Sequence, residues 1–148
     1  MKTLDICNKQ VISVLANTPL VEVAKLMRKN HIGAVVVVDG QDSRRPLGIV
    51  TDRDIVVEVV ASGLDARALK ASEIMSDSLA TTAAGDDVSW SLKIMRDHGV
   101  RRLPVVDGGG AMVGIVALDD LLKAYASTLH DVAQALGTER IVEVALRA

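Results

Sequence analysis

The chain has 148 residues, of which 49% are hydrophobic and 24% are charged, and this composition excludes an intrinsically disordered protein. One tryptophan, one tyrosine and no phenylalanine leave no row of rings on which bases could stack, and a formal net charge of −2 has the wrong sign for a polyanion-binding surface. We therefore expect a folded protein that does not bind nucleic acid and in which any anion site is local.

The cysteine, histidine and hydropathy patterns exclude further classes of protein. Cys7 is the only cysteine, which excludes an intrachain disulfide and fits a reducing compartment. The three histidines match no metal-binding spacing, so we expect no metal site. The N-terminal residues lack the apolar core of a signal peptide, and the longest apolar run, Ala34 to Val38, is too short to cross a bilayer. We expect a cytoplasmic protein with no membrane segment.

The first half of the chain predicts a strand, a helix and a hairpin in that order. Val11 to Val14 is a short β-type stretch. Thr18-Pro19 matches an N-cap followed by proline at the first helical position, which predicts a helix from there to about Asn30. Ala34 to Asp39 and Leu47 to Thr51 are Val- and Ile-rich runs that flank a polar turn, and this pattern predicts a buried β-hairpin.

A further helix is expected from Asp52 to about Ala61, where Ser62-Gly63 supplies a left-handed cap. The second half repeats this order, with a helix near Val88 to His98 for which Asp86 is the expected N-cap. Two further strands are expected near Leu103 to Val106 and Met112 to Ala117. Each half therefore predicts a β-α-β-β-α unit.

The final helix carries more apolar surface than one such unit needs. An apolar stripe continues at helical spacing towards Gly137, through Leu118, Leu121, Leu122, Tyr125, Leu129, Val132 and Leu136. The surplus favours contact with a partner, and the alternative is a helix that wraps its own domain. The sequence leaves both possibilities open.

The two halves are also related residue by residue. Three segments recur at a displacement of 68 positions, namely Asp5 to Cys7 with Glu73 to Met75, Leu26 to Arg28 with Ile94 to Arg96, and Val37 to Gly40 with Val105 to Gly108. Gly48-Ile49-Val50 then aligns with Gly114-Ile115-Val116 at a displacement of 66, because one turn is shorter by two residues. The chain is an internal repeat of units of roughly sixty residues.

The segment Gly48 to Asp54 is the strongest candidate for ligand binding. It lies where the last strand of the first unit turns into its helix, so free N–H groups and a positive dipole end are expected there. Thr51 adds a hydroxyl, and the carboxylate of Asp54 is suited to the two adjacent hydroxyls of a ribose. The same Thr-x-x-Asp spacing is also typical of an ordinary helix capping box.

The repeat and these residues together resemble a tandem pair of cystathionine-β-synthase-type (CBS) domains. Gly48 to Asp54 matches the signature Gly-h-x-[Ser/Thr]-x-x-Asp of that family, in which h is hydrophobic, and Val100 to Asp107 is similar to its second repeat. The resemblance implies an α+β fold of two β-α-β-β-α repeats that pack with pseudo-two-fold symmetry. We expect repeats at residues 1–68 and 69–136, followed by a C-terminal tail at 137–148.

The resemblance also implies a regulatory protein, not an enzyme, which binds an adenosine-containing ligand between the repeats. Thr51 and Asp54 would hold ribose, with Arg53 beside them in the signature, and Ile32, Gly33 and Ala34 would form the adenine wall. Arg101 and Arg102 of the other repeat would bind phosphate, because a guanidinium is a permanently charged planar fork. AMP, ADP, ATP or NAD is the expected ligand class, and no tightly held cofactor is expected.

The second cleft is expected to be weak. Asp120 is retained there, but Ala117 replaces the signature Ser or Thr, and Gly33 and Ala34 stand where the other cleft has its paired arginines. The overall expectation is a cytoplasmic adenine-nucleotide sensor that forms a homodimer and acts on an unidentified effector protein. An adenosylmethionine-type sensor and an interaction scaffold with decayed clefts are the alternatives.

Overall fold

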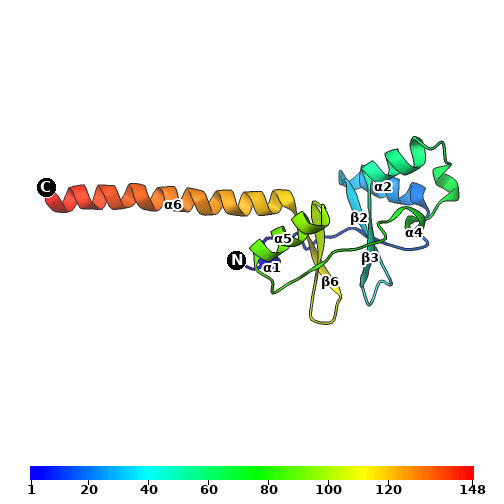
Figure 1. Cartoon of the computed structure of the whole chain (residues 1–148), viewed down its shortest axis with the longest axis horizontal. Helices are drawn as coiled ribbons and strands as arrows, with labels where there is room; N and C mark the ends of the chain where they lie inside the picture. The colour runs from blue at the N-terminus through cyan, green and yellow to red at the C-terminus, as the bar shows by residue number, and fades with distance from the viewer.

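A computed structural model describes residues 1–148 and shows an α+β protein with two three-stranded sheets (Figure 1). Each half of the chain builds one sheet and the short helices beside it, as the sequence predicts. The elements of the first half are α1 (Thr3–Ile6), β1 (Ser13–Leu15), α2 (Leu20–Asn30), β2 (Ala34–Val38), β3 (Pro46–Thr51), α3 (Asp52–Asp54), the π-helical segment η1 (Ile55–Val60) and the 3-10 turn η2 (Ala66–Ala68). Those of the second half are α4 (Ala71–Ile74), β4 (Thr82–Ala83), α5 (Val88–His98), β5 (Arg102–Val106), β6 (Met112–Ala117) and α6 (Leu118–Arg147).

The two sheets have the same topology and the same register. In the first, β1 runs parallel to β2 and β2 pairs antiparallel with β3, and the order β4-β5-β6 repeats this arrangement. Ala34 pairs with Thr51 as Arg102 pairs with Ala117, and both hairpins carry an irregularity at the same place, after Val37 and after Val105. Both predicted hairpins are therefore confirmed, and the pseudo-symmetry extends to the bulges.

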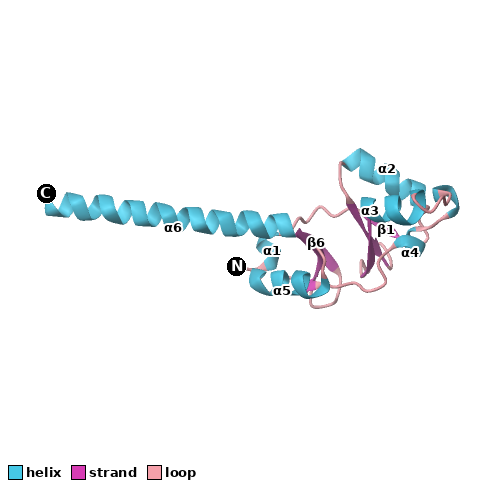
Figure 2. Ribbon diagram, turned by 45° about the horizontal axis from the view of Figure 1, so that its top comes forward, coloured by secondary structure: helices cyan, strands magenta, loops and turns pink.

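The sheets face each other across a shared apolar layer. Val36, Val38 and Met112 are buried there, and the half-buried side chains packed around them come from both sheets and from Val11 just before β1, namely Val11, Leu15, Ile49 and Ile115. Each repeat also has its own core beneath its helices, centred on Leu20 and Val35 in the first and on Leu103 and Leu121 in the second. Figure 2 shows the strands in the centre, with the helices on the outside.

The short helices α1 and α4 pack on the opposite repeats. The N–H groups of Thr3 and Leu4 donate to the carbonyls of Asp86 and Ala84, at 2.9 and 3.2 Å. In the equivalent place, the N–H of Ala71 donates to the Thr18 carbonyl at 2.9 Å. Each repeat thus begins with a segment that completes the other one, which couples the two halves by main-chain hydrogen bonds.

Two predicted helix caps are wrong by one residue. Pro19 is the N-cap of α2, because its extended backbone (ψ 137°) precedes the first helical residue, and no side chain caps this helix, so Thr18 lies outside it. Asp87 caps α5 by accepting from Ser89 N, whereas Asp86 accepts from Thr82 Oγ1 and Ala83 N in the preceding turn.

The predicted helix from Asp52 to Ala61 is not a regular α-helix. Only α3 has α-helical bonding, and Ile55–Val60 continues it as a wider π-helix in which, for example, Ala61 N donates to the Val56 carbonyl at 2.9 Å. Gly63 has a positive φ of 69°, as expected for the residue that ends this segment.

The last helix continues well past Gly137. α6 runs for 30 residues to Arg147, so the expected tail at 137–148 is its final part. Its first two turns contact α1, α5 and β6, and Leu121 is its one buried residue. Beyond them it projects from the body of the protein in both views (Figures 1 and 2). It does not wrap its own domain, which was one of the two possibilities.

Candidate functional site

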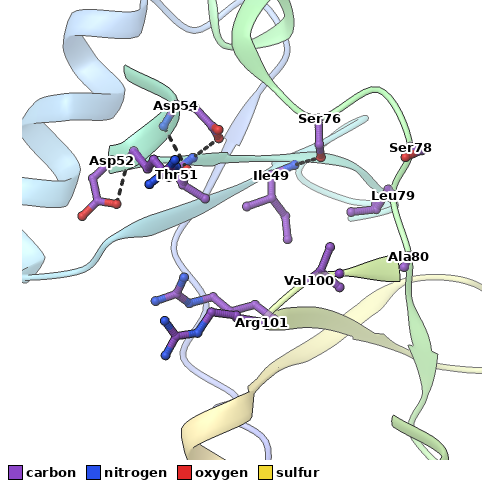
Figure 3. A pocket seen from close by; sticks show the side chains of 13 residues that line it. Ile49, Thr51, Asp52, Asp54, Ser76, Ser78, Leu79, Ala80, Val100 and Arg101 are labelled. Atoms are coloured by element: carbon purple, nitrogen blue, oxygen red, sulfur yellow. Dashed lines mark hydrogen bonds between the residues drawn. The ribbon is translucent and has the colours of Figure 1, made fainter. Parts of the chain in front are cut away.

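A cleft of about 530 Å³ opens between the two repeats, within the range typical of small-molecule sites (Figure 3). One wall is the end of β3 and the start of α3, and the other is the approach to β5. The chain that joins the repeats closes one side. The lining residues are Ile49, Thr51, Asp52, Arg53, Asp54, Ser76, Ser78, Leu79, Ala80, Gly99, Val100, Arg101 and Arg102.

Thr51 and Asp54 form a capping box at the start of α3. Thr51 N donates to Asp54 Oδ2 at 2.8 Å, and Asp54 N donates to Thr51 Oγ1 at 3.1 Å. These two bonds fix both side chains at the cleft wall. Asp54 Oδ1 accepts no hydrogen bond from the protein. The cap and the candidate ligand site are therefore compatible, because only one carboxylate oxygen is used for the cap.

The helix start does not present free N–H groups, contrary to expectation. Asp52 N donates to the Gly33 carbonyl at 3.0 Å, and Arg53 N donates to Asp52 Oδ1 at 2.8 Å. Asp54 N is held by Thr51, as described above. Since each of these donors already has a partner, an anion in this cleft must be bound chiefly by side chains.

Three arginines supply the positive charge of the cleft. Arg53 comes from the first repeat, and Arg101 and Arg102 come from the second. The cleft also contains two negative charges, the carboxylates of Asp52 and Asp54. Arg101 lies 3.7 Å from Asp119, and both of these side chains are about three-quarters exposed, so this ion pair is weak and easily exchanged. In Figure 3 the side chain of Arg101 lies across the cleft from Thr51 and Asp54.

The apolar wall comes from residues that the sequence analysis did not assign to the adenine wall. Ile49, Leu79, Ala80 and Val100 form it (Figure 3). The linker residues Ser76 to Ala80 lie outside both recognisable motifs, and only the position of the linker between the repeats could have indicated them. Ser76 is held at β3, because Ile49 N donates to its Oγ at 3.3 Å and its own N–H donates to the Ile49 carbonyl.

Ile32, Gly33 and Ala34 do not line this cleft. Ile32 packs against the core of the first repeat, and Ala34 pairs with Thr51 in the sheet. A Cβ atom at Gly33 would lie 3.0 Å from a carboxylate oxygen of Asp52. These residues are the repeat equivalents of Val100, Arg101 and Arg102. Because the cleft is built from the α3 end of one repeat and the β5 approach of the other, it uses the second-repeat copies.

The equivalent place in the other half lacks most of these groups. Asp120 caps α6, accepting from Ala117 N at 2.9 Å, but Ala117 has no hydroxyl that could accept a hydrogen bond from Asp120 N in return. Asp119 stands where the first half has Arg53, and the opposing segment carries Gly33 and Ala34 in place of the paired arginines. This second site therefore has one acidic group, Asp119, where the first has Arg53, and uncharged residues where the first has its paired arginines.

No three His, Cys, Asp or Glu side chains converge in a way that could hold a metal ion. No helix, α6 included, combines the length and apolarity needed to cross a membrane.

Comparisons with known proteins agree with this architecture. A family model described as the CBS domain matches residues 4–61 and again 71–127. An uncharacterized protein from Methanopyrus kandleri is 38% identical over 119 residues, which is 80% of this chain and 60% of that protein. The structure of hypoxic response protein I with two coordinated zinc ions has 34% identity and a TM-score of 0.73, over 83% of this chain and 98% of that one. The structure of a CBS domain protein from Pyrobaculum aerophilum complexed with AMP has 28% identity and a TM-score of 0.74, over 86% and 99% of the two chains.

Proposed function

The chain belongs to the CBS domain family, and we propose that it is a regulatory sensor that binds an adenine nucleotide, AMP, ADP, ATP or NAD, in the cleft between its two repeats. One observation carries this proposal. The cleft has a carboxylate with one uncommitted oxygen on one wall and arginines from the opposite repeat on the other, and apolar side chains line the same cleft. A nucleoside phosphate carries the matching groups, because its ribose diol links a flat base on one side to an anionic phosphate on the other.

The polar groups have separate roles in this proposal. Asp54 Oδ1 accepts from the ribose hydroxyls, and Thr51 keeps the carboxylate in place through the capping box. Arg101 and Arg102, with Arg53, bind phosphate through charge-assisted bonds. Because the main-chain donors of α3 are occupied, the arginines determine the preference for a phosphorylated ligand.

The base has its own part of the cleft. The side chains of Ile49, Leu79, Ala80 and Val100 sandwich the adenine ring, which loses contact with water there. The related AMP complex from Pyrobaculum aerophilum supports the choice of an adenine ligand. The second site, which lacks the three arginines, is a weak site in this proposal and takes at most a less charged adenosine compound.

The proposed role is regulation and not catalysis. The cleft has no pairing of a nucleophile with a base, which covalent catalysis requires, and the family model that matches is a CBS domain. We propose a cytoplasmic homodimer that passes its ligand state to an effector protein. The single cysteine fits a reducing compartment.

A thermal-shift screen tests the proposal against its two alternatives. A ligand at a hundred times its dissociation constant stabilises the native state by about 2.7 kcal/mol, which raises the melting temperature of a domain of this size by roughly 5 to 10 °C. We expect this shift with AMP, ADP, ATP or NAD. A shift with adenosylmethionine alone identifies the adenosylmethionine-type sensor. No shift with any of these compounds at millimolar concentration favours the interaction scaffold.

A further inference from the structure

The projecting part of α6 carries an apolar seam that no other part of the chain covers. Every residue from Tyr125 onward is exposed. Spacings of three and four residues alternate along Leu122, Tyr125, Leu129, Val132 and Leu136, with exposed fractions from 40% to 69%. This is the pattern of the a and d positions of a coiled coil, in which two helices pack along such a seam.

A helix of this kind needs a partner. Most helical stability in proteins comes from packing of an apolar face. About 25 residues beyond the first turns of α6, at 1.5 Å per residue, project some 35 to 40 Å from the body without such packing (Figure 1). Exposed side chains in this number and arrangement mark an interaction surface.

We propose that the occupant is a second copy of this chain, whose α6 packs antiparallel on the first. Leu118 is engaged with the core of its own repeat, so the free seam begins at Leu122. We place the two-fold axis of the dimer, where the two helices cross, between residues 130 and 131. In this register Leu129 contacts Val132 of the partner subunit. Leu136 meets Tyr125 of the partner subunit, and the two-fold axis repeats both contacts. Four central layers are then wholly apolar.

The charges beside the seam complement each other in the same register. Asp119, Ala126, Ala133 and Arg140 follow one another at intervals of seven residues along one edge of the seam. Antiparallel pairing places Asp119 beside the partner's Arg140 at both ends, and the two alanines leave room at the centre. Arg140 forms no ion pair within its own chain, and the only one formed by Asp119 is the long, exposed contact with Arg101. This complementarity selects a second copy in this orientation. The assembly goes beyond ligand binding, because the residues of the seam lie outside the cleft.

Matched charge insertions test the interface. Leu129→Asp places a charge in a central layer, whereas Ser127→Asp places the same residue on the opposite face of the same helix, where it is exposed. By light scattering without nucleotide we expect about twice the 15.7 kDa of one chain for the unmodified protein and for Ser127→Asp. Leu129→Asp should return the mass of one chain at the same micromolar concentration. A monomeric unmodified protein, or a Leu129→Asp variant that stays dimeric, overturns the proposal.

A distance measurement tests the orientation without relying on a disruptive variant. A spin label at Ala145→Cys, in a Cys7→Ser background, lies about 14 residues from the crossing point. At 1.5 Å per residue the two labels of an antiparallel dimer should be about 44 Å apart. A parallel pair would bring them within about 20 Å, and that result, or the absence of any dipolar coupling, contradicts the antiparallel dimer. Neither outcome bears on nucleotide binding, which the thermal-shift screen measures separately.

Discussion

The Sγ atom of Cys7 lies directly against Gly114, where an added Cβ atom would be only 2.5 Å away from it. Cys7 belongs to the segment that begins the first repeat, and Gly114 lies within strand β6 of the second repeat. The equivalent pair is Met75 and Gly48, for which the corresponding distance to Sδ is 2.8 Å. Each glycine therefore provides space for the first segment of the other repeat. Burial raises the pKa of the Cys7 thiol, so this contact is made by a neutral group.

Replacing Gly114 should weaken the packing of the Cys7 segment against β6 of the second repeat. We expect Gly114→Ala to lower the free energy of unfolding by about 1 to 3 kcal/mol, because the methyl group would overlap Cys7 and lie 3.0 Å from the Asn8 carbonyl. Urea denaturation measures this change. Gly85→Ala is the matched control, since nothing lies within 4 Å of a Cβ atom there. Adding Cys7→Ala to Gly114→Ala should restore part of the loss, and a Gly114→Ala variant as stable as the control would contradict the steric argument.

A buried cluster of hydroxyls in the second repeat leads to another prediction. Ser91 is fully buried, and its Oγ lies 2.7 Å from Thr3 Oγ1 and 2.9 Å from Thr82 Oγ1. The repeat-equivalent residues are Val23, Ala71 and Val14, which are buried together in the core of the first repeat. The same framework thus accepts either a hydrogen-bonded set or an apolar set.

Breaking the hydroxyl cluster in part should cost more than replacing it entirely. Ser91→Ala removes one of the two hydrogen-bond partners of each buried threonine hydroxyl, which then keeps only its bond to Asp86, and we expect a loss of about 1 to 3 kcal/mol in the free energy of unfolding. The combined change Thr3→Ala, Thr82→Val and Ser91→Val copies the first repeat and should recover most of that loss, because no polar group is then left unpaired. Urea denaturation of both variants measures the difference. If the triple variant is the less stable of the two, the repeats do not have interchangeable cores.

Local signals account for the parts of the fold that the sequence predicts well. The bounds of α5 and of both hairpins follow from side-chain periodicity and turn residues, which depend on short stretches of chain. The repeat itself predicts which residues are equivalent, and the structure confirms the equivalence of Cys7 with Met75 and of Gly48 with Gly114.

The remaining features depend on how the repeats pack. The cleft between the repeats is completed by residues 100–102 and not by their equivalents 32–34. The way the sheets face each other determines this choice, and no local sequence pattern contains that information. The length of α6 was missed for a different reason. The expected tail begins at Gly137, but a glycine in an exposed helix costs only about 1 kcal/mol and does not necessarily end it.

Acid should destabilise the cap of α5. Ser89 donates its hydroxyl and its N–H to Asp87 Oδ1, at 2.6 and 2.9 Å, and these bonds, together with the nearby terminal amino group, hold the pKa of Asp87 well below its ordinary value. Since this pKa is lower in the folded than in the unfolded protein, the stabilisation is complete above about pH 4 and is lost as the pH falls towards the lowered value.

Asp87→Asn isolates this contribution, because asparagine still caps a helix but does not titrate. Between pH 6 and pH 3 the unmodified protein should lose more of its free energy of unfolding than Asp87→Asn does. Asp42→Asn, in a loop where the side chain forms no hydrogen bond, should behave like the unmodified protein. Equal losses in all three proteins would show that the cap has no role in acid stability.

The carboxylates of the two clefts should contribute unequally to AMP binding. Asp54→Asn preserves an acceptor for Thr51 N but removes the charge proposed to hold the ribose hydroxyls, so we expect a loss of roughly ten- to a hundredfold in affinity. Asp120→Asn should have a much smaller effect, since Ala117 and the missing arginines weaken its cleft. Calorimetric titration with AMP measures both. If Asp120→Asn abolishes binding while Asp54→Asn does not, the second cleft is the working site.

The paired arginines should determine the preference for a phosphorylated ligand. Arg102→Ala removes a permanent charge from the wall opposite Asp54, and no main-chain donor at the start of α3 is available to replace it. We therefore expect this variant to lose roughly tenfold or more in affinity for AMP while its affinity for adenosine changes little. Arg67→Ala, whose side chain pairs with Asp65 away from the cleft, is the control and should bind both ligands normally. The preference of the unmodified protein for AMP should also weaken as salt is raised, because the arginines are exposed enough to be screened. Calorimetric titrations with AMP and adenosine at two salt concentrations give all of these values, and an equal loss for both ligands would show that Arg102 supports the shape of the cleft and not the phosphate.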